Sequence, residues 1–182
     1  MMLYILAGVV LTAIVVWFIL TKRVLLMLDE NKKNAMAQIG VQVSGRWDAV
    51  SELIYLIKEY SESDYAELSE TIKERQYINA ESSAQDAAAQ NNMLRQVMVH
   101  IMAVAERYTE LRANSEFQKN VDSINMYDGM VRQSRLVYND SITNFNRSIS
   151  SLPTSFLARA LGFSMCEYLE AKDEENSVPN AK

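Results

Sequence analysis

The sequence predicts an all-α protein in which an N-terminal transmembrane helix continues into a long antiparallel helical bundle, with three long helices and a short C-terminal helix. Three observations predict this class. The 182-residue chain contains only five Gly and two Pro, too few for a turn-rich sheet protein. Residues 1–20 carry no charged side chain. Apolar residues then recur at steps of three and four, which is the spacing of helices that pack on one another.

The first element is residues 1–20, which we expect to be a transmembrane anchor. About 20 helical residues at ~1.5 Å each match a hydrocarbon core of roughly 30 Å. Tyr4 and Trp17 lie near its two ends, where aromatic rings prefer the headgroup region. Lys22 and Arg23 follow, in place of the small residues of a signal-peptide cleavage site. An uncleaved anchor is therefore expected; a buried hairpin and an unusual signal peptide remain the alternatives.

The distribution of basic residues predicts the orientation of the anchor. Lys22, Arg23, Lys32 and Lys33 follow the anchor, and no basic side chain precedes it. Loops rich in Lys and Arg tend to stay in the cytoplasm. We therefore expect a single-pass protein with its N-terminus outside and residues 21–182 in the cytoplasm.

Residues 21 to about 62 are expected to continue the anchor as one helical rod, because no Gly or Pro follows the anchor until Gly40. Gly40 and Gly45 each weaken this rod by about 1 kcal/mol relative to Ala. The polar cluster at residues 61–64 is the predicted turn. The seam of the rod steps alternately by four and three residues through Ile39, Val43, Arg46, Val50, Leu53, Ile57 and Tyr60.

A second long helix is predicted from Asp64 to Thr109, with a weaker, Ala-rich and polar middle from Ala80 to Asn92. Asn114 is a suitable N-terminal cap for the next helix. If the long helices alternate in direction, the turn at residues 109–114 faces the membrane.

The third long helix, residues 114–152, has the most regular spacing, and Pro153 ends it. Its seam runs through Phe117, Val121, Ile124, Asp128, Val131, Arg135, Tyr138, Ile142, Phe145, Ile149 and Leu152.

Three charged residues lie in the buried phase of these seams: Arg46, Asp128 and Arg135. A buried charge is costly unless it is paired. We therefore predict a polar layer in which Asp128 meets Arg46 or Arg135, and which fixes the register of the helices. In the alternative, the side chains extend to the edge of the bundle.

A short apolar segment follows Pro153. With alternating helix directions it would lie at the far end of the rod, about 60 Å from the bilayer. A fourth helix that folds back over the groove between the three long helices is one interpretation, and a contact with a neighbouring subunit or partner is the other. Its candidate contact residues are Phe156, Leu157, Leu161 and Phe163. Residues 21–170 would form the bundle, and residues 171–182 are polar and predicted to be a disordered tail.

Several segments carry a family resemblance. They are Lys33–Val43, Arg46-Trp47-Asp48 with Lys58-Glu59-Tyr60, Leu111–Phe117, Arg135–Asn146 and Leu161-Gly162-Phe163. In order and spacing they resemble the LemA family of membrane-anchored bacterial proteins, and Arg135–Asn146 is the most specific. The resemblance covers most of the chain. It implies a small antiparallel helical bundle on an anchor in the bacterial inner membrane, without an accepted enzymatic activity. Relatives include a protein required for making magnetosome membranes and others encoded beside a membrane metalloprotease.

The sequence departs from the family pattern at a few positions. Gly40 replaces a residue that is usually Asp, Ser51 stands where Pro is common, and Thr109 replaces the usual turn Pro. Without a rigid stop before Asn114, a merged helix or altered self-assembly is an alternative.

Side chains that could carry out chemistry are scarce. The chain has one Cys and one His, which excludes an intrachain disulfide and the usual Cys or multi-His metal sites. Val97 lies three residues before His100, where a bundle metal site would need Glu. A Cys166–His100 nucleophile pair lacks an orienting motif. We expect that the protein is not an enzyme and that it binds no cofactor. The net charge of −5 argues against nucleic-acid binding.

These observations predict a non-enzymatic scaffold that self-assembles at the bacterial membrane and organises or remodels it. The alternative is an adaptor for a membrane protease or signalling partner. The expected partners are the lipid bilayer, further copies of the chain, and in the second case another membrane protein. The methionines, among them Met93, Met98, Met102, Met126 and Met130, are expected to fill the core rather than form a partner surface.

Overall fold

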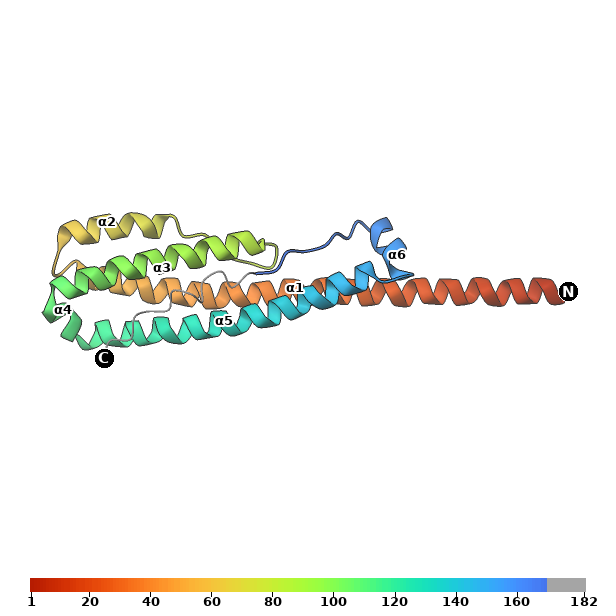
Figure 1. Cartoon of the computed structure of the whole chain (residues 1–182), viewed down its shortest axis with the longest axis horizontal. Coiled ribbons are helices and arrows are strands. Elements are labelled where there is room, and N and C mark those ends of the chain that lie inside the picture. Colours follow the sequence, from red (N-terminus) through yellow and green to blue (C-terminus); the bar gives the residue numbers. More distant parts are fainter. Residues whose placement is uncertain (170–182) are drawn as a thin grey trace.

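The computed structural model describes residues 1–169, and within that range the chain is all-helical, as the sequence predicts (Figure 1). The predicted tail, residues 171–182, lies outside the described residues. The helices are α1 (Met2–Ile57), α2 (Glu62–Lys73), α3 (Ala84–Arg107), α4 (Thr109–Ala113), α5 (Ser115–Ser150) and α6 (Thr154–Ala160).

α1 is one uninterrupted helix of 56 residues, and neither Gly40 nor Gly45 breaks it. Its N-terminal part, residues 2–23, projects beyond the bundle and contains no buried residue (Figure 1). We call this part the stem. This part is long and apolar enough to cross a membrane, and none of it is buried in the protein. Its C-terminal part contributes one face to the core, including the fully buried Trp47.

Side-chain caps set the predicted turns. Ser61 precedes α2, and its hydroxyl accepts a hydrogen bond from the Asp64 N–H at 3.2 Å. Asn114 precedes α5 and accepts from the N–H groups of Glu116 at 2.8 Å and Phe117 at 3.3 Å. These bonds satisfy N–H groups that have no partner within their own helices. α4 lies between Arg107 and Asn114 as a separate turn of helix, so α3 and α5 do not merge.

The prediction of one returning helix from Asp64 to Thr109 is wrong. α2 runs back along α1, residues 74–83 continue in the same direction, and α3 then reverses toward α4 (Figure 1). α3 is therefore parallel to α1, and α5 is antiparallel to both. Consequently the turn at residues 108–114 lies at the end of the bundle far from the stem, not at the end facing it.

Local polar bonds and one close contact produce this reversal. Asn79 Oδ1 accepts from the Glu81 N–H at 2.9 Å, and Ser83 forms a reciprocal capping box with Asp86 at the start of α3. Gly40 lies against the backbone carbonyl of Ile78, where a Cβ atom would overlap it. The extended segment can lie on α1 because residue 40 has no side chain.

A second, smaller core cluster joins α6 to the stem end of the bundle. Leu157 and Ala158 of α6 pack with Leu25 of α1 and with Phe145 and Ile149 of α5. The predicted position of the segment after Pro153 is therefore wrong, because α5 runs toward the stem and not away from it. Of the four candidate contact residues, Leu157 is buried, Phe163 is half-buried, and Phe156 and Leu161 are exposed.

Candidate functional site

Arg46 lies at the centre of a polar layer between α1, α3 and α5. Its side chain is buried, with 6% of the residue exposed. Nη1 donates to Asn91 Oδ1 at 2.9 Å and lies 2.9 Å from Asp128 Oδ1. Burial lowers the pKa of the Arg46 guanidinium, and the Asp128 carboxylate opposes that effect. The pairing of Asp128 with Arg46 is one of the two arrangements predicted from the sequence.

Arg135 does not enter this layer. Its half-buried side chain lines a cavity of about 630 Å³ between α1, α3, α5 and the segment after α6, together with Ile39, Asn91 and Leu169. Asp128 instead has Arg132, one turn along α5, as a second cationic neighbour at 3.4 Å. Of the three charged seam residues, Arg46 is therefore buried and paired with the half-buried Asp128, whereas Arg135 belongs to the wall of the cavity.

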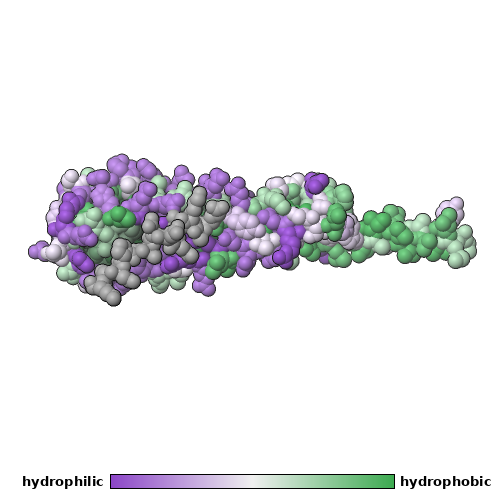
Figure 2. Space-filling model, in the orientation of Figure 1, coloured by the Kyte–Doolittle hydropathy of each residue, from purple (hydrophilic) through white to green (hydrophobic). Residues whose placement is uncertain are grey.

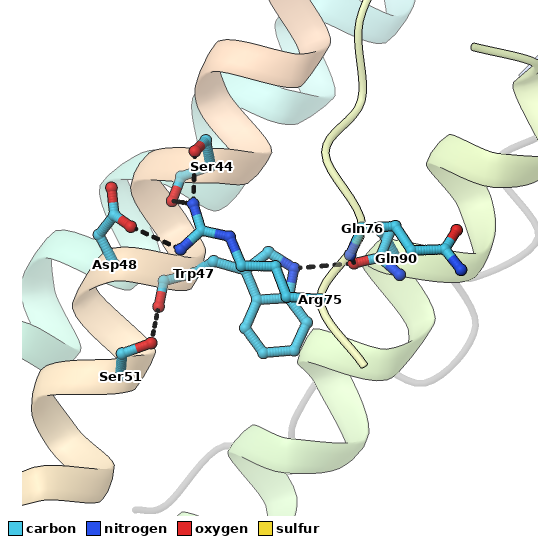
Figure 3. A network of polar contacts seen from close by, with 7 residues as sticks. All are labelled: Ser44, Trp47, Asp48, Ser51, Arg75, Gln76 and Gln90. Carbon is cyan, nitrogen blue, oxygen red and sulfur yellow. Dashed lines mark hydrogen bonds and ion pairs between the residues drawn. The ribbon is translucent and has the colours of Figure 1, made fainter. Parts of the chain in front are cut away.

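A second polar network ties residues 74–83 to the helices on either side (Figure 3). Gln90 Oε1 of α3 accepts from Trp47 Nε1 and from the Gln76 N–H, both at 3.1 Å. On the α1 side, Arg75 donates to Ser44 Oγ at 2.6 Å and to Asp48 Oδ1 at 2.7 Å.

Neither Gln90 nor Asn91 is predicted from the sequence, because periodicity alone makes their stretch a polar weak point of a long helix. The available signal was the capping box formed by Ser83 and Asp86, since a helix that begins at Ala84 places both amides on its second turn.

The segment after α6, residues 163–169, lies along α5 in extended form; we call it the strap. Asn146 donates from Nδ2 to the Cys166 carbonyl and accepts at Oδ1 from the Cys166 N–H, both at 2.9 Å. Asn139 pairs with Leu169 in the same way, at 3.0 Å and 2.9 Å. Seven helical residues rise about 10.5 Å and three extended residues span about 10 Å, so the two asparagines match the repeat of the strap.

The strap gives a structural reason for the most distinctive motif of the sequence, Arg135–Asn146. Besides Asn139 and Asn146, the motif contains Tyr138, whose hydroxyl donates to the Glu167 carbonyl at 3.3 Å. Burial raises the pKa of the Tyr138 hydroxyl. The motif therefore provides a series of backbone contacts for the C-terminal segment.

The structure does not bring the only histidine and the only cysteine together. His100 of α3 faces Glu67 of α2, with 3.9 Å between Nδ1 and Oε1. Cys166 lies on the strap and accepts a hydrogen bond from Lys32 Nζ at 3.2 Å. Among residues 1–169, no three His, Cys, Asp or Glu side chains are placed to hold a metal ion.

The residues predicted to anchor the chain all lie on the stem of α1. Tyr4 is 82% exposed and Trp17 is 38% exposed, and Lys22 and Arg23 are exposed just before the first contact with the bundle at Leu25. This arrangement leaves the whole circumference of the stem open to its surroundings.

Fold and site together define a class of protein: an all-α bundle with a buried polar layer, whose central helix extends into an apolar stem. The chain belongs to the LemA family, since the LemA family model matches residues 35–182. The match begins within α1, after the stem. A comparison with curated proteins gave no match.

Proposed function

We propose that this protein is a non-enzymatic scaffold, anchored in the bacterial inner membrane by the stem and self-associating through its cytoplasmic bundle. The observation that carries the proposal is the continuity of α1, a single 56-residue helix that is bare and apolar at one end and a core helix at the other. Such a helix holds the bundle rigidly to whatever the stem occupies.

The composition and exposure of the stem favour the anchor. Helical residues 2–20 span roughly 28 Å, close to the thickness of a hydrocarbon core. A helix buried in a soluble core would be covered by its neighbours, whereas the stem is not covered. Lys22 and Arg23 at its inner end favour a cytoplasmic bundle.

Exposed methionines favour a lateral contact between copies. Met102, Met126 and Met130 are all exposed, contrary to the expectation that these residues fill the core. On α5, Met126, Met130 and Val137 are spaced by four and seven residues, so they share one face of the helix. Adaptable Met side chains suit weak protein contacts, and anchoring raises the effective concentration of copies beside one another.

The test is the mass of the full-length protein in detergent, measured by light scattering or by imaging of single particles. We expect a large, discrete assembly for the natural sequence and smaller species for Met130→Glu. Asn125→Glu is the matched control, since Asn125 is exposed on α5 about 140° around the helix from Met130. This control should keep the natural mass.

A natural sequence that stays monomeric or dimeric at every concentration would contradict self-association and favour the adaptor. Fractionation of cells tests the anchor separately, because an anchored chain sediments with membranes whether or not it assembles.

A further inference from the structure

Apolar side chains are exposed at the end of the bundle where the stem emerges. Figure 2 shows hydrophobic atoms at the α6 end of the bundle next to the hydrophobic stem. Three of these residues belong to α1 and three to α6 and its flanking turns. They are Val24, Leu26, Met27, Leu152, Phe156 and Leu161, and we call this set the collar.

The position of α6 along α1 sets the height of the collar. Leu157 and Ala158 hold α6 against Leu25, which lies five residues, or roughly 7 Å, beyond Leu20. The headgroup layer on one side of a bilayer is about 5–8 Å thick. If residues 2–20 span the hydrocarbon, α6 therefore lies at the level of the headgroups.

The two faces of α6 differ in what covers them. Leu157 and Ala158 are buried against α1 and α5, whereas Phe156 is 69% exposed. Within residues 1–169 the stem alone extends beyond α6 in the direction of the N-terminus (Figure 1). Amphipathic helices that bind membranes lie in the interface, with their apolar face buried about 5–10 Å at the boundary of headgroups and acyl chains.

The charged side chains at this end of the bundle also favour a membrane interface. Lys22 and Arg23 of α1 and Arg159 of α6 are all exposed, so cationic groups lie among the collar residues. Anionic headgroups attract such clusters within a Debye length of the surface.

We propose that the collar is a second membrane contact, inserted at the boundary between headgroups and acyl chains in the leaflet from which α1 emerges. This inference rests on the proposed anchoring of the stem. The occupant is the bilayer around the chain's own anchor. The collar would hold the bundle against the membrane surface at a fixed rotation about α1.

The test uses spin labels on the full-length chain, in vesicles of phosphatidylcholine and phosphatidylglycerol. In a Cys166→Ser background, Phe156→Cys places a label on the collar. Leu136→Cys is the matched control, because Leu136 is 68% exposed on α5, away from α6. Ile14→Cys reports on the anchor. The measurement is the ratio of collision rates with oxygen, which dissolves in lipid, and with a water-soluble nickel complex.

We expect the ratio of oxygen to nickel collisions at position 156 to be several-fold higher than at position 136, with position 14 higher still. A label at Leu152→Cys should repeat the result for position 156. Equal ratios at 156 and 136, with position 14 deep in lipid, would overturn the collar and leave the anchor standing. A water-exposed label at position 14 would overturn the anchor and the collar together.

Discussion

At the scale of single residues, two helical glycines differ in the space that surrounds them. Gly40 of α1 faces the carbonyl of Ile78, whereas Gly129 of α5 has open space where a Cβ would lie. Alanine raises helix propensity at either position by about 1 kcal/mol. Only at Gly40 does the added methyl group meet backbone, which cannot move aside as a side chain can.

We predict that Gly40→Ala lowers the free energy of unfolding by about 1–2 kcal/mol. A Cβ atom that overlaps a backbone carbonyl belongs in the upper part of the usual overpacking cost, about 2–3 kcal/mol, which exceeds the gain in propensity of about 1 kcal/mol. Thermal unfolding in detergent, followed by circular dichroism, measures the change. Gly129→Ala is the control and should be neutral or raise the melting temperature. A Gly40→Ala protein as stable as Gly129→Ala would show that Ile78 does not lie on α1.

The polar layer leads to a second prediction at this scale. Asp128→Asn leaves the buried Arg46 without its anionic partner, which can cost about 3–5 kcal/mol for a fully buried pair. Because 37% of the Asp128 side chain is exposed, solvent screening reduces the expected loss to about 1–2 kcal/mol. Urea unfolding measures it, with Asp140→Asn, an exposed position on α5, as control. Equal stability of the two variants would mean that the pair contributes little.

At the scale of elements, the long helices could be predicted because their seams are regular. The periods of α1 and α5 fix which faces are buried, and Ser61 and Asn114 are recognisable caps. The reversal at residues 74–83 could not be predicted from periodicity. Its stretch is rich in helix-forming residues, and its stability comes from tertiary contacts with Gly40 and Gln90.

Because the sequence does not predict this reversal, the expected direction of every later helix is the opposite of the observed one. The position of α6 follows from the direction of α5, so the sequence predicts Leu157 at the end of the bundle opposite to the one it occupies. The strap was missed for a different reason. Asn139 and Asn146 resemble ordinary surface residues until an extended segment lies beside them.

The strap provides the prediction at this scale. Asn139→Ala with Asn146→Ala removes the side-chain acceptors of the Leu169 and Cys166 N–H groups. Each asparagine makes two hydrogen bonds to the strap. At about 1 kcal/mol for each net hydrogen bond, the loss of two should make each amide exchange with deuterium about 30-fold faster. Hydrogen exchange read by mass spectrometry measures this. Asn144→Ala, exposed on the same helix, should leave exchange unchanged, and unchanged exchange in the double variant would contradict the role of the pair.

At the scale of the whole molecule, the basic residues at the inner end of the stem predict which side of the membrane the bundle occupies. In bacterial cells that produce the Cys166→Ser protein, a maleimide that cannot cross membranes should label Met2→Cys in intact cells. It should label Leu136→Cys only after the cells are permeabilised, because both side chains are exposed in the protein and only the membrane protects one of them. The reverse pattern would place the bundle outside the cytoplasm.

The unbroken course of α1 also makes the molecule a lever. The far turn at residues 108–114 lies roughly 55 Å beyond Leu20, the length of about 37 helical residues. If the stem spans a bilayer as proposed, a tilt of the stem moves this turn. Membrane-spanning helices tilt by about 20° on average, which would displace that turn sideways by about 19 Å. Small changes in bilayer thickness that alter this tilt would therefore be magnified at the distal end of each copy, and would change how closely two neighbours approach there.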